Sequence, residues 1–496
     1  MLSNPFTLGA LLIIVAYAVI SPIIRALTTS LRSIPGPFLA RFTRLWELHA
    51  VYKHDFATYS IALHRKYGPV VRLAPNRYSI NDTEATKVLL GHHKALDKSN
   101  YYTAFGDPFQ GNIFTETNIH IHSKQRRPIA QLYSNNTLLS YEPHVDTCNK
   151  ILLKRLREHS QNGTCLDVPE LMQYYAFDVI GEITLGSRFG FMEDNGDNAG
   201  IIAAIDNGLT HGAKAGLIPE LHWVLCRVTK YLSIKPEFAK VMDFILYHIQ
   251  NRVSGYTKSP DDRHDFLDKL LPLEESGKAT RADTINACGS NIGAGSDTTA
   301  ISLTAAIAYL AMHQEVVTRL REELDNAVRD GLASDPITFK ESQKLPYLHA
   351  VVQEALRMHS AVGAPLTRVI GSDGATLAGQ YFPPGIEVGV NPWVIHNNEE
   401  IFGPDASEFK PERWLTADAE KRATMDRNFL AFGAGPRTCI GKNISLLEMY
   451  KVIPQIVREF DFEILDNEEF KGGYTWKTFF FAKQNLHCLV RERARV

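Results

Sequence analysis

The sequence predicts a mainly α-helical protein with small β-sheets, an α+β fold, built as a single large domain behind an N-terminal transmembrane helix. Three observations support this prediction: an uncharged stretch near the start, long helical patterns in the middle, and a few short strand-like segments. We expect a membrane anchor over residues 1–25, a proline-containing hinge over 26–40 and one domain over 41–496, because no linker or repeat interrupts that last part.

The first element is the uncharged segment 6–24. Its length suffices for a helix that crosses the roughly 30 Å hydrocarbon core of a bilayer. A cleaved signal peptide is the alternative, but such peptides have a shorter apolar region preceded by a basic residue, and none precedes this one. Arg25, Arg32, Arg41 and Arg44 follow the segment, so the positive-inside rule puts the remainder of the chain in the cytosol.

The amino-acid composition argues against a disordered protein, a nucleic-acid-binding protein and a disulfide-stabilised protein. Hydrophobic residues make up 45% and charged residues 22%, which are globular values and exclude general disorder. A formal charge of −2 gives no electrostatic basis for nucleic-acid binding. The six cysteines are scattered without a CxxC pair, so they do not predict a disulfide framework.

The remaining elements follow in order along the chain. Ile34-Pro35-Gly36-Pro37 is the hinge, because its prolines cannot continue a helix. Residues 284–312 are apolar or small on nearly every side, which predicts a buried central helix. Proline-rich residues 391–437 are expected to be irregular, and loops of such length are commonly functional. The other predicted elements are a hairpin over 70–73 and 77–80, helices over 314–329 and 347–358, and strands over 367–370 and 387–390.

The most informative segment is Phe-Gly-Ala-Gly-Pro-Arg-Thr-Cys-Ile-Gly, residues 432–441. Gly435 permits a tight turn, and a helical pattern follows, so Cys439 is predicted just ahead of a helix N-terminus, where the pKa of a thiol is lowered. Phe432 is placed to shield the sulfur and Arg437 to bind an anionic group. A buried structural thiol is the alternative interpretation of an isolated cysteine.

This segment resembles the ligand loop FxxGxRxCxG of the cytochrome P-450 superfamily at every fixed position. The resemblance implies that Cys439 ligates the iron of haem b and that Phe432, Arg437 and Gly441 contact the cofactor. Thiolate ligation favours cleavage of the O–O bond. We therefore expect a mono-oxygenase that inserts one atom of dioxygen into a small apolar molecule by hydroxylation, O-demethylation or epoxidation.

A second motif, Ala-Gly-Ser-Asp-Thr-Thr at residues 294–299, resembles the oxygen-activation element of the same family. The resemblance implies that Thr298 hydrogen-bonds dioxygen or an adjacent water and that Asp297 relays protons. Gly293 and Gly295 in mid-helix predict a kink or a close approach of another group.

Two charged motifs resemble structural elements of the family. Glu354-Ala-Leu-Arg357 places opposite charges on one helix face, and Pro411-Glu-Arg413-Trp follows later in the chain. The resemblance implies a network of Glu354, Arg357 and Arg413 that holds the loop carrying Cys439. A solvated surface ion pair is the alternative.

The resemblance also indicates which residues hold the haem propionates. Arg126 and Arg368, together with Arg437, would neutralise these two carboxylates. His122 stands where most relatives have Trp, and its imidazole is a further donor. The expected pocket residues are Tyr102, Phe105 and Phe114 of an aromatic-rich segment, Ala294, and Ala364 and Phe480, which fall where the family lines its pocket. Aromatic residues that simply fill the core are the alternative. The expected pocket residues predict an apolar, polycyclic or terpenoid-like substrate, and apolar residues over 204–225 are expected to touch the bilayer.

The partners follow from the same resemblance. One haem domain leaves no room for flavin modules, so electrons from NADPH come through a separate flavoprotein reductase, with Lys124, Arg127 and Lys442 as its expected docking surface. We expect a monomer, anchored by a single span in the endoplasmic reticulum membrane with its catalytic domain in the cytosol.

Segments that begin at Arg127, Phe177 and Val390 resemble the fungal pisatin-demethylase-like branch, which implies secondary metabolism or detoxification. Two other functions are the alternatives. A haem-thiolate isomerase or dehydratase without external electrons does not need the pair Asp297 and Thr298. A non-catalytic membrane haem sensor would have a filled distal side, whereas Ala294 and its flanking glycines predict an open one.

Overall fold

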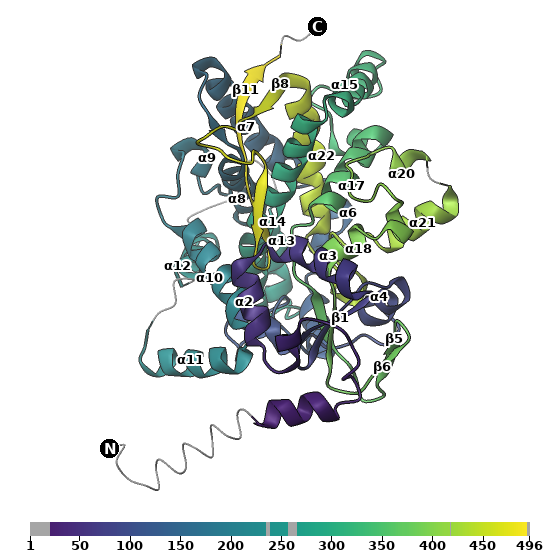
Figure 1. Ribbon diagram of the computed structural model, residues 1–496. Helices are drawn as coiled ribbons and strands as arrows, with labels where there is room; N and C mark the ends of the chain where they lie inside the picture. The colour runs from purple at the N-terminus through teal and green to yellow at the C-terminus, as the bar shows by residue number, and fades with distance from the viewer. Residues whose placement is uncertain (1–19, 235–238, 256–264, 417, 494–496) are drawn as a thin grey trace.

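The computed structural model describes residues 20–234, 239–255, 265–416 and 418–493. The predicted mainly helical fold with small sheets is confirmed (Figure 1). The helices are α2 (Leu45–Lys53), α3 (Phe56–Tyr67), α4 (Thr83–Leu90), α5 (Ile119–Arg126), α6 (Asn135–Leu138), α7 (Glu142–Asn162), α8 (Val168–Leu185), α9 (Phe191–Asp194), α10 (Ile201–Ala215), α11 (Pro219–Tyr231), α12 (Ala239–Val253), α13 (Phe266–Glu275), α14 (Arg281–Met312), α15 (Gln314–Arg329), α16 (Phe339–Ser342), α17 (Pro346–Met358), α18 (Pro392–His396), α19 (Glu399–Phe402), α20 (Arg413–Thr416), α21 (Ala419–Arg427) and α22 (Lys442–Glu459).

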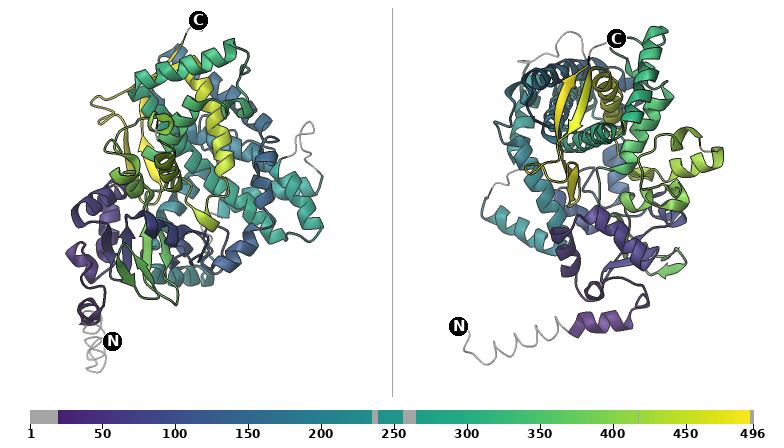
Figure 2. Two further views of the ribbon diagram at one scale, coloured as in Figure 1. Left: turned by 90° about the vertical axis from the view of Figure 1, so that its right-hand side faces the viewer. Right: turned by 45° about the horizontal axis from the view of Figure 1, so that its top comes forward.

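Short strands form small sheets beside these helices. They are β1 (Val70–Ala74), β2 (Arg77–Ile80), β3 (Leu166–Asp167), β4 (Leu366–Val369), β5 (Ala375–Leu377), β6 (Gln380–Phe382), β7 (Glu387–Val390), β8 (Phe460–Ile464), β9 (Thr475–Thr478), β10 (Ala482–Asn485) and β11 (His487–Glu492). The largest sheet has the order β1-β2-β7-β4, in which β2 and β7 are parallel and the other pairs antiparallel. It lies at the end of the molecule near the N-terminal helix, and the long helices fill the other end (Figures 1 and 2).

Helix α14 runs through the centre, as the apolar pattern predicted. It begins with a capping box in which the Thr280 hydroxyl accepts from the Asp283 N–H, while the Asp283 carboxylate accepts from the Thr280 N–H. The helix is uninterrupted from Arg281 to Met312. Gly295 has a packing role, because a Cβ there would lie 3.1 Å from Ile180 of α8. The sequence predicted either a kink or a close approach of another group at the mid-helix glycines, and at Gly295 the close approach is found.

The prediction of a wholly irregular segment over 391–437 is wrong. Helices α18 to α21 and a 3-10 turn at Gly435–Arg437 lie within it. Each helix is four to nine residues long, too short for an apolar period to be visible in the sequence. Side-chain caps start several of them: Asn391 accepts from the Trp393 N–H, and Asn398 accepts from the Glu400 N–H.

The predicted hinge, residues 34–37, contacts the large sheet. The Arg72 N–H donates to the carbonyl of Pro35 at 2.9 Å, and a Cβ on Gly36 would lie 2.6 Å from the Arg72 carbonyl. Residues 20–28 before it are helical, whereas residues 1–19 of the predicted anchor lie outside the described part of the chain. Within that described part no single helix has the length and apolar content of a membrane span; α14 and α15 meet the criterion only as a pair bent by 107°.

Candidate active site

The loop over residues 432–441, here the cysteine loop, leads from the 3-10 turn into α22. Within it the Cys439 N–H donates to the carbonyl of Phe432 at 2.9 Å, and the Thr438 N–H donates to that of Gly435 at 3.1 Å. Gly435 has a φ of 68°, and a Cβ there would lie 1.7 Å from the Leu90 carbonyl oxygen. Only glycine fits at this position, since a side chain would collide with the end of α4.

The thiol of Cys439 faces hydrogen-bond donors. The backbone N–H groups of Gly441 and Lys442 at the start of α22 and the guanidinium of Arg126 lower its pKa, but the larger effect of burial keeps that pKa above its ordinary value. Cys439 nevertheless retains accessible surface. A bound metal cation deprotonates a coordinating thiol outright, so this donor set fits a thiolate ligand to iron.

Five cationic or imidazole side chains gather beside the cysteine loop: Lys98, His122, Arg126, Arg368 and Arg437. Arg126 donates to the Thr438 carbonyl at 2.8 Å, and Lys98 pairs with Arg368 in an isolated β-bridge. Burial and the charges of Arg368 and Arg437 hold the pKa of Lys98 well below its ordinary value. Burial and the four neighbouring cations lower the pKa of His122 to about 3.

These cations have few anionic neighbours within the described residues: Asp97 and Glu116 act on the charge of Arg437, from beyond salt-bridge distance. Neither Lys98 nor any of the three arginines makes a salt bridge with a described residue, and Nδ1 of His122 and Nε of Arg437 are buried without a hydrogen-bond partner. Buried charges require pairing. The cluster therefore fits a cofactor that brings two carboxylates to this position, as haem does.

Lys98 was missed by sequence reasoning. It donates to the Phe114 carbonyl at 2.6 Å and lies 4.2 Å from the centre of the Tyr102 ring. Its neighbours Arg368 and Arg437 come from distant parts of the chain, so no local spacing marks it. Only its tertiary position between these groups reveals it.

Helix α14 presents Ala294 and Thr298 to accessible space, although Ser296, Asp297 and Thr299 between and beside them are buried. The Thr298 hydroxyl donates to the Ala294 carbonyl at 2.8 Å. The Thr299 hydroxyl donates to Ser445 of α22 at 3.2 Å, so this part of α14 packs against the helix that follows the cysteine loop.

Asp297 has partners that the sequence did not indicate. Its Oδ1 accepts from Nε2 of Gln173 at 2.5 Å and lies 3.1 Å from Nζ of Lys483. Burial raises the pKa of Asp297, and the Lys483 charge opposes that rise. A buried carboxyl with a raised pKa is suited to proton transfer.

The predicted pocket residues Tyr102, Phe105, Phe114, Ala364 and Phe480 meet in one apolar cluster. Ring centres of Phe105 and Phe480 lie 4.9 Å apart, and those of Phe105 and Phe114 lie 5.6 Å apart with nearly perpendicular planes. The contact between Phe105 and Phe114 is edge-to-face, a geometry that stabilises aromatic pairs. Ala294 lies on α14 and is not a member of this cluster.

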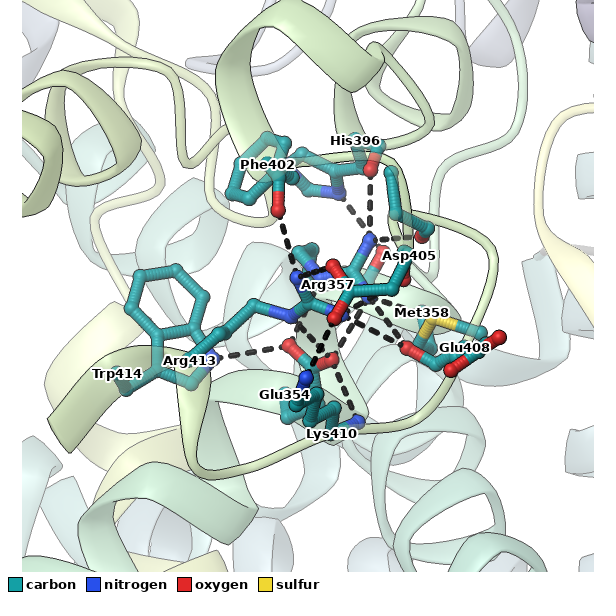
Figure 3. Close-up of polar contacts among 11 residues, drawn as sticks. Glu354, Arg357, Met358, His396, Phe402, Asp405, Glu408, Lys410, Arg413 and Trp414 are labelled. Atoms are coloured by element: carbon teal, nitrogen blue, oxygen red, sulfur yellow. Dashed lines mark hydrogen bonds and ion pairs between the residues drawn. The ribbon is translucent and has the colours of Figure 1, made fainter. Parts of the chain in front are cut away.

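The network of Glu354, Arg357 and Arg413 is present and buried, so a solvated surface pair is excluded. Arg357 donates to both carboxylate oxygens of Glu354 at 2.8 Å, and Arg413 donates to Oε1 at 2.8 Å (Figure 3). Trp414 and the Lys410 N–H add two further hydrogen bonds to the same carboxylate. This saturation lowers the pKa of Glu354 despite its burial.

Comparison with known proteins shows the family of the chain. Residues 35–489 match the family described as Cytochrome P450. The chain is 42% identical over 488 residues to a pisatin demethylase of Fusarium vanettenii, covering 97% of this chain and 94% of that one. It is 37% identical over 475 residues to a cytochrome P450 monooxygenase of Aspergillus terreus (91% and 94% covered) and 35% identical over 472 residues to cytochrome P450 monooxygenase gsfF of Penicillium aethiopicum (92% and 92%). Members of the cytochrome P450 family draw electrons from NADPH through a reductase. The chain thus belongs to the cytochrome P450 family and is a haem-dependent mono-oxygenase.

Proposed function

We propose that this chain is a membrane-anchored mono-oxygenase of fungal secondary metabolism or detoxification, with Cys439 as axial ligand to the haem iron. The observation that carries the proposal is the cysteine loop, where backbone N–H groups face a thiol beside buried or half-buried cations that form no salt bridge with a described residue. When bound, haem supplies the activation of dioxygen.

The chain's own residues would hold that cofactor. His122, Arg126, Arg368 and Arg437 would bind the two carboxylates, and Lys98 adds a fifth group. Phe432 is half-buried within the cysteine loop and lies beneath Lys442, whose Nζ is 5.7 Å from the ring centre. Phe432 would shield the sulfur from water, and the Gly441 N–H would stabilise its negative charge.

Two residues of α14 would serve the reaction. Oδ2 of Asp297 is buried and has no hydrogen-bond partner in the described part of the chain, so it can take and release a proton. Thr298 follows directly, and its hydroxyl can orient a water at the accessible face of the helix. The aromatic cluster would keep bulk water away from the substrate.

The substrate is proposed to be a small apolar molecule. The rings of Phe105, Phe114 and Phe480 favour a flat or polycyclic compound. Because the similarity to a pisatin demethylase spans nearly the whole chain, oxidative demethylation is the first reaction to test.

Exposed apolar side chains support membrane contact. Helix α11 exposes Leu221, Val224, Leu225, Val228 and Tyr231. The helix over 20–28 exposes Ile20, Ile23, Ile24 and Leu27, and both helices lie at one end of the molecule (Figure 1). Large exposed apolar patches are typical of membrane or protein contacts. We assign residues 1–25 to a single-span anchor in the endoplasmic reticulum, 26–40 to the hinge and 41–496 to a cytosolic catalytic domain.

The reductase would dock on the face around Lys124, Arg127 and Lys442. All three are exposed, and none makes a salt bridge to a described residue. Such a basic surface would attract an acidic partner, and electrostatic steering speeds this kind of encounter. We propose that the enzyme works as a monomer with this separate NADPH-dependent flavoprotein.

The test is the absorption spectrum of the dithionite-reduced protein under carbon monoxide. Wild type should show the strongly red-shifted Soret band of thiolate ligation, Cys439→Ala should lose it, and Cys226→Ala, which removes a half-buried thiol elsewhere, should keep it. A wild-type band at the histidine-ligated position, or no haem at all, would refute the proposal. With reductase and NADPH, release of formaldehyde from pisatin then tests demethylation.

A further inference from the structure

We propose that Lys483 is the positioning residue for Asp297 and that it couples the Asp297 carboxylate to Asp206 on α10. The inference rests on the proposed role of Asp297 in proton transfer and extends it to residues that no family motif contains.

Three elements meet at this ion pair. Nζ of Lys483, on β10, lies 3.1 Å from Oδ1 of Asp297 on α14 and 2.5 Å from Oδ1 of Asp206 on α10. The Asp297 side chain is 1% exposed, whereas those of Lys483 and Asp206 are 38% and 41% exposed. A single ammonium group therefore connects a buried carboxylate with a carboxylate in contact with solvent.

The contacts at Asp297 are asymmetric. Lys483 and Gln173 both bind Oδ1, whereas Oδ2 is buried and has no hydrogen-bond partner among the described residues. A carboxylate held by one oxygen has a fixed orientation, and its other oxygen remains available for a proton. Lys483 and Gln173 thus hold Oδ1 of Asp297 in place, and Oδ2 is the atom available to accept and release a proton.

Lys483 is the cation that opposes the rise in the pKa of Asp297. Burial and the Asp206 charge raise the pKa of Asp297, and Lys483 and the Gln173 hydrogen bond lower it. Among the described residues, Lys483 and Asp206 are the charged groups with the largest effect on this carboxyl. Without Lys483, two carboxylates would face each other with no cation between them, so Asp297 would bind its proton more tightly.

The position of Lys483 is itself determined by packing. The next residue, Gln484, donates to the Ile301 carbonyl of α14 at 2.9 Å, which seats β10 one turn beyond Asp297. On the other side, α10 covers the aromatic cluster, since a Cβ on Gly212 would lie 2.8 Å from the Phe105 ring. The Lys483–Asp206 pair therefore ties the helix over the pocket to the carboxyl of Asp297.

The chain provides a matched control. Lys477 of β9 lies directly opposite Lys483 in the β9–β10 hairpin and carries the same charge. It donates instead to the backbone carbonyls of His54 and Tyr52 at 2.7 and 3.2 Å. Replacing Lys477 thus removes an equal charge from the same hairpin without touching Asp297.

The experiment is an infrared titration of the haem-loaded enzyme, in which the Asp297 carboxyl band is identified by its loss in Asp297→Asn. Lys483→Met should raise the pKa of Asp297 by about one to three units, the usual effect of an opposite charge at this distance. Lys483→Arg should restore the wild-type value, and Lys477→Met should leave it unchanged. An unchanged pKa in Lys483→Met would overturn the proposal.

A second variant keeps the test decisive if Lys483→Met does not fold. Asp206→Asn should lower the pKa of Asp297, because it removes a negative charge and keeps Lys483 in place; an unchanged pKa would again overturn the coupling. The carbon monoxide spectrum separates this proposal from the haem assignment. A red-shifted band with no change in the Asp297 titration refutes only the role of Lys483, whereas a histidine-type band refutes only that of Cys439.

Discussion

The backbone N–H of Leu430 donates a hydrogen bond to Nε2 of His396 at 2.8 Å. The carbonyl of the same histidine accepts from Arg357 at 2.7 Å. Leu430 precedes by two residues Phe432, whose carbonyl accepts from the Cys439 N–H. His396 therefore links the Glu354 network, through its backbone carbonyl, to the segment that leads into the cysteine loop, through its imidazole.

The link requires a neutral His396. Burial lowers its pKa from 6.5 to about 3, and Nε2 must be unprotonated to accept from Leu430. Its contribution to stability is complete above pH 6.5 and is lost as the pH falls toward 3. We expect His396→Phe to lower the free energy of unfolding by about 1–3 kcal/mol at neutral pH, because the Leu430 N–H loses its partner. Between pH 6.5 and pH 3, the free energy of unfolding of the His396→Phe variant should also change less with pH than that of the wild type.

Urea unfolding at a series of pH values measures both effects. His92→Phe is the control, since His92 is exposed and the substitution should leave the pH dependence as in wild type. Equal pH slopes for His396→Phe and wild type would contradict the role of this histidine.

A second prediction concerns the carboxylate at the centre of Figure 3. Glu354→Gln removes one buried charge and leaves Arg357 and Arg413 without it. Breaking a buried pair in this way costs about 3–5 kcal/mol. Urea unfolding should show that loss, while Asp373→Asn, which breaks the exposed pair with Lys94, should give no measurable change. Similar stabilities of the two variants would show that the network is not structural.

The resemblance to the cytochrome P-450 family predicted this network, because the motifs Glu354-Ala-Leu-Arg357 and Pro411-Glu-Arg413-Trp are compact in the sequence. The sequence could not predict His396, whose partners Arg357 and Leu430 come from separate segments joined only in the fold. The sequence also could not predict the hydrogen bond between Asp297 and Gln173, because these residues are 124 positions apart in the chain. Residues in compact motifs were therefore found, and those whose role depends on tertiary contacts were not.

Among the helices, too, the sequence predicted long regular elements and did not predict short ones. The long pattern over 284–312 predicted α14 to within three residues, because an all-round apolar surface persists over many turns. Helix α18 has five residues and is buried throughout, so neither length nor amphipathic period marked it. Short capped helices depend on local side-chain hydrogen bonds, which a search for apolar periodicity does not detect.

A third prediction tests the turn ahead of Cys439. Gly435→Ala would place a Cβ 1.7 Å from the Leu90 carbonyl oxygen, so the cysteine loop must move away from α4. We expect purified protein with little or no bound haem, measured as the ratio of Soret to protein absorbance. Gly385→Ala is the matched control: its φ is 81°, but nothing lies within 4 Å of the new Cβ. It should cost only about 1–2 kcal/mol of backbone strain and retain haem. Normal haem content in Gly435→Ala would contradict the prediction.

The last prediction is that Lys98→Met has opposite effects on the protein without and with haem. Without haem, Lys98 is a buried cation repelled by Arg368 and Arg437, so an apolar side chain of similar length should raise the free energy of unfolding by about 1 kcal/mol. With haem, a carboxylate would be the partner that this ammonium lacks, so the variant should lose haem to apomyoglobin about tenfold faster, a difference of about 1.4 kcal/mol. Lys94→Met, at an exposed lysine, should change neither quantity. If Lys98→Met destabilised both forms equally, its effect would be one of packing, and Lys98 would not be a cofactor contact.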